Sequence, residues 1–356
     1  MKKIGVIGGG LAPYFNEAMA NQMYILSKKL NAQVITCNDI GLLPFKKMGQ
    51  YFIVNSKFIM NETPFLPFIN GALLYAITKL YGRKFDVIII PNGLDSVFLN
   101  YLDLKKCVLV VSAIPFINGN VEKRIKKIGS KLRGIIAQSK RTKEQLVETG
   151  VGPDKIRVMY PLIDLSKFKY SEPPPLNKFK ILFASSPNLE VAGEDNFRDK
   201  GVPLLLESFK EFIKGEDAIL YIVWRGKYNK ALCQLINRLD LEDHVEVIDN
   251  VVEMPEMYAK VHVTVIPFLN LWRSPEIPLS AVESLACGRP VVATDIGEIA
   301  ELVQRYKCGC VAKPVKDDFL KSLILCKKNY SSFQINCRKA TEDLVENWNQ
   351  YEVCKA

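Results

Sequence analysis

The chain has 356 residues, which is enough for two domains of ordinary size. Its 48% apolar and 24% charged residues are typical of a soluble globular protein, and the absence of any run of 18 apolar residues excludes a predicted membrane-spanning helix. Residues 1–165 hold 23 Lys and Arg against 11 Asp and Glu, whereas residues 166–356 hold 25 against 27. This asymmetry indicates a partner surface on the first half.

The first half alternates apolar runs of strand length with helical patterns. Strands are predicted at residues 3–8, 32–37, 85–91, 107–113, 134–139 and 156–161. Helices are predicted over 16–30 and 140–150. The continuous apolar runs FDVIIIP and CVLVVSA are typical of parallel strands that are buried on both faces. We therefore expect a doubly wound α/β domain over residues 1–165.

Three glycines, Gly8, Gly9 and Gly10, follow the first predicted strand in the stretch GGGLAP. They match only part of the dinucleotide fingerprint, because Pro13 stands at its third glycine position and Asp39 lies one or two places late for a ribose ligand. Three interpretations stay open: a cofactor loop of a dehydrogenase or flavoprotein, a loop whose N–H groups bind phosphate, and a tight turn without a ligand.

Three consecutive prolines in SEPPPLNK, residues 171–178, predict a linker. After them the α/β pattern restarts, so we expect a second Rossmann-like domain at 166–330 and a C-terminal helix over 331–356 that returns towards the first domain. Strands are predicted at 179–185, 218–224, 244–249, 263–268, 290–295 and 309–313. Helices are predicted at 202–215, 229–241, 254–261, 278–288 and 299–306.

The stretch SPEIPLSAVESLACGRPVVATDIGEIAELV, residues 274–303, carries the most chemical information. A helix is predicted to begin near Pro278, so that the N–H groups of Leu279 and Ser280 point towards any anion above it. Two carboxylates, Glu276 and Glu283, flank this helix start. An anion site beside acceptors for sugar hydroxyls fits a nucleotide diphosphate sugar, and the alternative is an ordinary helix–strand unit.

This stretch resembles the signature of the retaining GT-B glycosyltransferases of family 4. Other segments resemble the same family in order and spacing, namely residues 135–168, KILFAS with DKGVPLLLESF, and the terminal stretch that ends in Trp348. The resemblance covers roughly residues 130–350. It implies two Rossmann-like domains that face a central cleft, with the acceptor on the N-terminal side and the donor on the C-terminal side.

The resemblance assigns roles to single residues. Glu283 matches the glutamate that holds the donor ribose, and the backbone of Leu279 and Ser280 matches the positions that meet the diphosphate. Lys200 matches the basic residue on the diphosphate, where a fixed ammonium stabilises the departing group. Proteins of this fold typically work without a bound metal, so we expect no cofactor besides the nucleotide sugar.

Three departures from the family pattern matter. Six residues separate Glu276 from Glu283 instead of seven, so Glu276 acts as the first catalytic glutamate only if the loop shifts by one residue. The usual arginine after the 179–185 strand is missing, and Arg225 or Arg198 are candidates to supply its charge. The acceptor-side histidine is also missing, and we expect His262 to be a core residue.

The sequence therefore predicts a glycosyltransferase that moves a hexose-type sugar with retention. Attack from the front face, with the leaving phosphate oxygen taking the acceptor proton, needs no side-chain base. Gly9 and Gly10 would then let the first βα loop approach the donor. A binding or regulatory protein on a decayed transferase fold is the alternative, and a nucleotide-cofactor oxidoreductase is a more distant one.

The acceptor side carries the excess positive charge. The basic stretch 121–134 and the apolar stretch 64–84, which ends in Arg83 and Lys84, predict peripheral docking on the cytoplasmic leaflet and a glycan or lipid-linked acceptor. The alternative is a core helix at 64–84 beside a solvated basic face. Nucleic acid is not expected, because no aromatic platform interleaves with the basic run.

Overall fold

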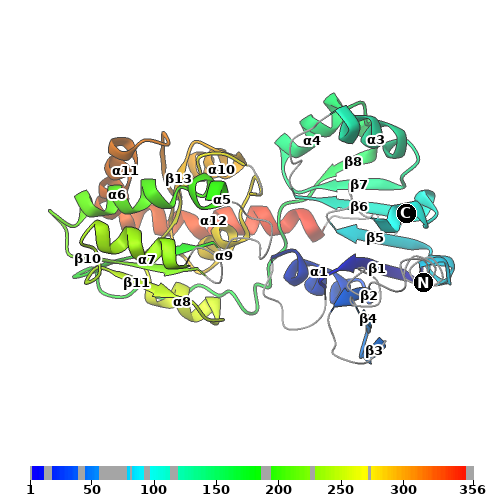
Figure 1. Cartoon of the computed structure of the whole chain (residues 1–356), viewed down its shortest axis with the longest axis horizontal. Helices are drawn as coiled ribbons and strands as arrows, with labels where there is room; N and C mark the ends of the chain where they lie inside the picture. The colour runs from blue at the N-terminus through cyan, green and yellow to red at the C-terminus, as the bar shows by residue number, and fades with distance from the viewer. Residues whose placement is uncertain are drawn as a thin grey trace. The chain divides into compact units, whose positions relative to one another are not determined.

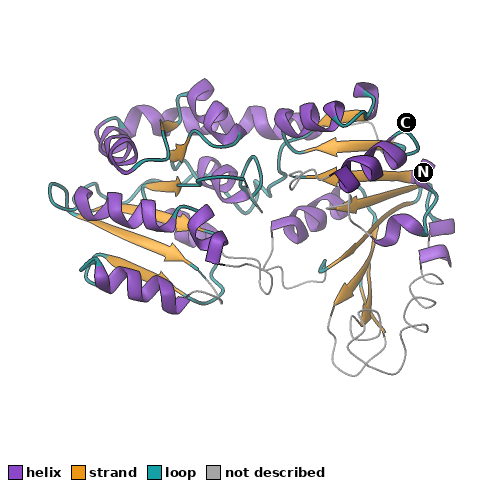
Figure 2. Ribbon diagram, turned by 45° about the horizontal axis from the view of Figure 1, so that its top comes forward, coloured by secondary structure: helices purple, strands orange, loops and turns teal. Residues whose placement is uncertain are grey.

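The computed structural model describes the chain in ten stretches: residues 2–11, 18–38, 45–55, 78–80, 82–91, 97–112, 119–185, 194–224, 229–271 and 274–349. The chain folds into two compact units, of which the first is Met1–Leu162 with Asn347–Ala356 and the second is Ile163–Glu346 (Figure 1). Each unit is built on one mainly parallel sheet with helices packed against it, as the alternating pattern predicts (Figure 2). Both units are Rossmann-like α/β domains.

The sheet of the first unit has the order β3-β4-β2-β1-β5-β6-β7-β8. All neighbouring strands of this sheet are parallel except β3 and β4. These two form an antiparallel hairpin that was not predicted from the sequence. The bounds are β1 (Ile4–Gly9), β2 (Gln33–Asn38), β3 (Phe45–Met48), β4 (Tyr51–Asn55), β5 (Val87–Pro91), β6 (Cys107–Val111), β7 (Gly134–Ala137) and β8 (Ile156–Val158).

Continuous apolar runs place the central strands of this sheet in the core. Every residue of β5 and β6 is buried, because helices cover both faces of a parallel sheet. The α-helices among the described residues of the unit are α1 (Ala18–Lys29), α3 (Gly119–Gly129) and α4 (Lys140–Glu148). Ser139 begins α4 by accepting the N–H of Thr142 at 2.8 Å, which is a normal N-cap.

The glycine turn lies at the end of β1. The strand order reverses at β1, because β2 lies on one side of it and β5, the next described strand after the β3–β4 hairpin, lies on the other. Gly8 has no room for a side chain, since a Cβ there would lie 2.9 Å from Cγ of Pro91 at the end of β5. Gly10 has a φ of +68°, a backbone conformation that favours glycine, whereas a Cβ at Gly9 or Gly10 would meet nothing within 4 Å. The N–H of Gly10 donates to Cys37 at 3.0 Å, which ties the turn to β2.

The sheet of the second unit has the order β11-β10-β9-β12-β13-β14, and all its neighbouring strands are parallel. The bounds are β9 (Phe179–Ala184), β10 (Ala218–Val223), β11 (Val245–Ile248), β12 (Val263–Ile266), β13 (Val291–Thr294) and β14 (Gly309–Ala312). This order places a switch in winding direction between β9 and β12.

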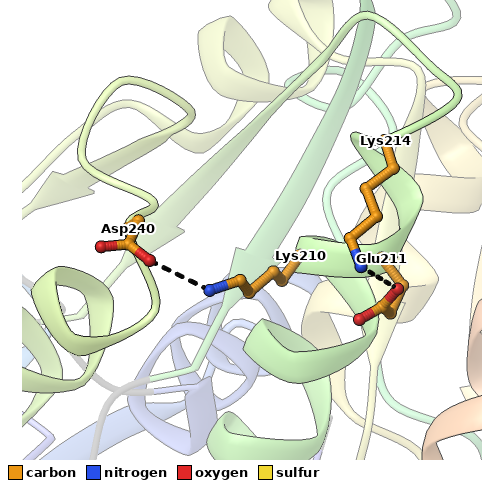
Figure 3. Close-up of polar contacts among 4 residues, drawn as sticks. All are labelled: Lys210, Glu211, Lys214 and Asp240. Atoms are coloured by element: carbon orange, nitrogen blue, oxygen red, sulfur yellow. Dashed lines mark hydrogen bonds and ion pairs between the residues drawn. The ribbon is translucent and has the colours of Figure 1, made fainter.

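Eight helices are described in the second part of the chain. They are α5 (Glu194–Asp199), α6 (Val202–Phe212), α7 (Asn229–Arg238), α8 (Met254–Lys260), α9 (Leu279–Ala286), α10 (Glu298–Tyr306), α11 (Lys316–Lys328) and α12 (Tyr330–Asn349). Lys210 of α6 pairs with Asp240 at 3.1 Å, and Lys214 pairs with Glu211 at 2.6 Å (Figure 3). These pairs are exposed and contribute little to stability.

Two buried residues, Arg289 and His262, tie the proline-rich stretch 171–178 to the core of the second unit through hydrogen bonds. The proline-rich stretch 171–178 lies within the unit, where the wholly buried guanidinium of Arg289 donates to Ser171 and Glu172. His262 is buried as expected, accepts the N–H of Lys180 at 2.9 Å through Nδ1 and donates through Nε2 to Pro174. Burial lowers the pKa of this histidine, so it is a neutral core residue.

No helix among the described residues is both long and apolar enough to cross a membrane. The eight cysteines in that part of the chain are free thiols.

In the basic stretch, α3 buries Ile125 and exposes Lys123, Lys126 and Lys127. The apolar residues 64–77 lie outside the described residues, and Arg83 and Lys84 are exposed.

Candidate functional site

The winding switch of the second unit defines where a ligand is expected. In an open α/β sheet, ligands bind outside the carboxyl ends of the strands, at the point where the strand order reverses. β9 and β12 are adjacent there, and they continue into Ser185 and Pro267 respectively. The residues that follow these strands therefore line the expected site.

Lys200 lies between α5 and α6 and reaches this edge of the sheet. Its ammonium donates to Oγ of Ser185 at 2.6 Å and lies 5.6 Å from the ring of Phe268, the second residue after β12. The residue is only 8% exposed, and burial lowers the pKa of Lys200 to about 8. No described carboxylate pairs with it, so its charge is available to an anion.

Gly201 explains why Lys200 sits so close to β12. Its φ is +70°, and a Cβ at this position would lie 1.7 Å from the carbonyl oxygen of Pro267. Only glycine permits this approach of two backbones. Leu269 also donates its N–H to the carbonyl of Asp199 at 2.8 Å, which fixes the two segments together.

The first turn of α9 offers backbone donors. Pro278 is the N-cap, and its carbonyl accepts from Ala281 at 3.1 Å and from Val282 at 3.4 Å. The N–H groups of Leu279 and Ser280 have no acceptor among the described residues, and both residues are half-buried. A helix start with free N–H groups attracts negative charge.

Glu283 projects from the middle of α9 and is 7% exposed. The hydroxyl of Tyr258 in α8 lies 3.0 Å from Oε2 of Glu283 and 3.0 Å from the carbonyl of Ser280. Burial raises the pKa of Glu283 to about 7, and the hydrogen bond from Tyr258 lowers it in part. Tyr258 thus ties this carboxylate to the first turn of its own helix.

Glu276, the other predicted glutamate, caps the N-terminus of α10. Its Oε2 accepts the N–H of Glu298, the first residue of α10, at 2.9 Å, and its carbonyl accepts from Ile299 at 3.1 Å. Gly297 has a φ of +82° and lets the loop pass over Glu276. A carboxylate at this place stabilises the N-terminus of α10. Glu276 is 4% exposed.

The second unit therefore gathers five of the predicted residues around α9 and the switch: Lys200, Glu276, Leu279, Ser280 and Glu283. Gly9 and Gly10 belong to the first unit and end β1. Arg225 lies outside the described residues. Arg198 is exposed in the last turn of α5.

Tyr258 and Phe268 were not predicted as neighbours of these residues, and the contact of Ser185 with Lys200 was not predicted either. Each belongs to a different element and has no motif of its own, so only the sheet order brings it to the site. Within the described stretches, no group of three His, Cys, Asp or Glu side chains is placed to hold a metal ion.

Comparison with known proteins connects this geometry to a family. Residues 187–326 match the family model described as Glycosyl transferases group 1. A glycosyltransferase from Rickettsia africae has a similar structure, with a TM-score of 0.71, 17% identity and 99% of each chain covered. The chain has the GT-B fold, and the match to the group 1 model lies within its second unit.

Two further proteins resemble this GT-B chain. The HepE protein of Anabaena, in complex with UDP-glucose, gives a TM-score of 0.70 at 16% identity and covers 99% of this chain and 98% of its own. N-acetyl-alpha-D-glucosaminyl L-malate synthase of Bacillus anthracis is 30% identical over 118 residues. That match spans 32% of this chain and 29% of the synthase.

Proposed function

We propose that the protein is a glycosyltransferase that uses a nucleoside diphosphate sugar, which it binds at α9 of the second unit. The observations that carry the proposal are two. Lys200 is buried at the carboxyl ends of β9 and β12, and buried Glu283 lies on α9, the helix after β12 whose first N–H groups are free. A buried cation and a helix start suit a diphosphate, and a buried carboxylate suits ribose hydroxyls. The group 1 family match over this part of the chain supports the same conclusion.

The donor base that we propose is uracil. The support is the Anabaena HepE structure, which is described in complex with UDP-glucose. We assign the ribose to Glu283 and the diphosphate to Lys200 together with the backbone of Leu279 and Ser280. Gly9 and Gly10 of the first unit are proposed to let the first βα loop approach this donor, since a side chain there would meet no other part of the described chain.

The proposed reaction retains the configuration of the sugar. The bond between the anomeric carbon and the diphosphate oxygen breaks while the acceptor oxygen attacks from the same face. The acceptor proton passes to the leaving phosphate oxygen, so no side-chain base is required. The Lys200 ammonium stabilises the charge that develops on this oxygen. The anomeric configuration of the product, read by NMR, tests retention.

Glu276 is the point at which a second candidate function enters. Because one carboxylate oxygen of Glu276 accepts from Glu298, the residue holds α10 in place. If it does not also contact the sugar, a donor-binding protein without transfer activity is the alternative. Donor binding without turnover in the presence of any acceptor would favour that alternative.

The acceptor is proposed to be a glycan or a lipid-linked sugar at the cytoplasmic face of a membrane. The support is the exposed basic face of α3 together with the charge excess of residues 1–165. Lys and Arg near an anionic surface gain about 1 kcal/mol each. Co-sedimentation with anionic and neutral vesicles at low and high salt tests this docking, and equal negligible binding to both would overturn it.

Donor binding is tested by thermal shift with UDP-, GDP- and ADP-sugars. A ligand at a hundredfold excess over its Kd stabilises the protein by about 2.7 kcal/mol. We expect UDP-sugars to raise the melting temperature of the wild type and of the surface controls Glu242→Gln and Lys260→Gln. Both control residues are exposed. Glu283→Gln and Lys200→Gln are expected to lose most of the shift, and the absence of any shift in the wild type would contradict the proposal.

A further inference from the structure

An open cavity lies in the first unit, at the edge of the sheet opposite to the glycine turn. It has a volume of about 780 Å³, within the usual range for ligand pockets. Its walls are the segment 102–105 before β6, the segment 130–133 before β7, and Lys155 before β8. It therefore opens at the amino ends of three adjacent parallel strands.

Four of the lining side chains are cations: Lys105, Lys131, Arg133 and Lys155. The lining contains a single carboxylate, Asp103, which accepts the N–H of Lys105 at 3.1 Å and so caps the short helix η4 (Leu104–Lys106). None of the three lysines forms an ion pair with a carboxylate in the described part of the chain. The cavity therefore holds a net positive charge.

Hydrogen bonds fix the walls of this cavity. The ammonium of Lys155 donates to the carbonyl of Leu132 at 3.2 Å, and the N–H of Arg133 lies 3.2 Å from the carbonyl of Leu104 and 3.0 Å from that of Cys107. Leu132 itself is 1% exposed. The segments that carry the cations are thus joined to one another and to the core, while Lys105 and Lys131 stay exposed at the rim.

We propose that this cavity binds the phosphate group of an anionic phosphoester. Four cations in one pocket repel each other, and a phosphate with its several acceptor oxygens neutralises them. Arg and Lys are the usual side-chain donors to phosphate. The site goes beyond the proposed donor function, because it belongs to the first unit and to the amino edge of the sheet. The phosphate comes from a lipid headgroup or from a soluble phosphoester.

The test compares the wild-type chain with Lys105→Gln/Lys131→Gln, which removes two exposed charges without touching the core. The matched control is Lys46→Gln/Lys47→Gln, whose two exposed lysines lie on β3 at the other end of the same sheet. Calorimetry with inorganic phosphate and glycerol 3-phosphate measures the soluble source. Co-sedimentation with phosphatidylglycerol vesicles in phosphatidylcholine measures the lipid source.

We expect the cavity variant to bind at least one of these probes roughly tenfold more weakly than the wild type and the control. Loss with glycerol 3-phosphate identifies a soluble phosphoester. Loss with vesicles in the cavity variant, but not in Lys123→Gln/Lys127→Gln on the exposed face of α3, identifies a headgroup in the cavity. Equal binding of every probe by all three proteins overturns the proposal. The thermal shift of the same variants with UDP-sugars reports on the donor site separately, and we expect it to be unchanged.

Discussion

The hydroxyl of Tyr258 lies 3.0 Å from Oε2 of Glu283, so two helices that are separated by β12 share one buried polar contact. The single proton of Tyr258 favours the ionised carboxylate and holds it near the start of α9. Tyr258 is wholly buried, and its ring packs edge-on against Phe168 at 6.1 Å.

Tyr258→Phe is expected to weaken UDP binding roughly tenfold, the effect of losing one hydrogen bond to a charged group. The phenylalanine ring keeps the packing. Because the hydroxyl lowers the pKa of Glu283, its loss raises that pKa and moves the pH at half-maximal binding upwards. Calorimetry across pH measures both effects. Tyr221→Phe on β10 is the control, and equal behaviour of the two variants would contradict a positioning role.

Glu283→Gln is expected to stabilise the protein at high pH. The folded pKa of about 7 lies above the ordinary value of 4.5, so the folded state keeps the proton while the unfolded chain ionises. The loss of stability therefore grows as pH rises from 4.5 to about 7 and is complete above that pH. At about pH 8 the variant should gain about 2–3 kcal/mol, and at about pH 4 it should gain almost nothing. Thermal melts at both pH values measure the difference, and a pH-independent effect would refute the assignment.

Lys200 is expected to take up a proton when a diphosphate binds. Without a ligand, burial lowers the pKa of Lys200 to about 8, so much of this side chain is neutral at about pH 8.5. A bound anion raises that pKa. Calorimetry of UDP binding in two buffers of different ionisation enthalpy measures the uptake. Lys260→Gln should keep it. Uptake that persists undiminished in Lys200→Gln would show that another group takes the proton.

Arg289→Lys is expected to destabilise the second unit by about 2–4 kcal/mol, because a lysine cannot reach all the oxygens that the planar guanidinium serves. Arg289 donates to the carbonyls of Tyr258, Ser171 and Glu172 and to Oγ of Ser171. Chemical denaturation measures the loss. Arg238→Lys on the exposed end of α7 should change the free energy of unfolding by less than about 0.5 kcal/mol. An equally small change in Arg289→Lys would contradict a structural role for Arg289.

The central strands of both sheets could be predicted because their residues are buried along continuous runs. VIIIP and CVLVV form β5 and β6 as expected, and PLSAVESLACG forms α9 with Gly288 at a φ of +76° after its end. The β3–β4 hairpin was missed, because FKKM has two charged residues and is too short for a clear alternation.

The contacts at the candidate site could not be predicted, because they join residues that are distant in sequence. Glu276 contacts Glu298 across 22 positions, and Tyr258 contacts Glu283 across 25. The burial of Arg289 was equally hidden, since all its partners at 171–172 except Oγ of Ser171 are backbone carbonyls that any residue provides. Local pattern gives the elements, whereas the sheet order determines which of them meet.

The most direct test of the account is the release of nucleoside diphosphate from UDP-, GDP- and ADP-sugars, with and without a panel of glycan and lipid-linked acceptors. We expect acceptor-dependent release from a UDP-sugar by the wild type, Glu242→Gln and Lys260→Gln. We expect release roughly a hundredfold slower in Lys200→Gln, because a charged group at a leaving phosphate typically contributes about that much. Release is also expected to be slower in Glu283→Gln, which loses the proposed contact with the ribose. Undiminished release in both site variants, or a thermal shift of the wild type by NAD(H) alone, would contradict the account.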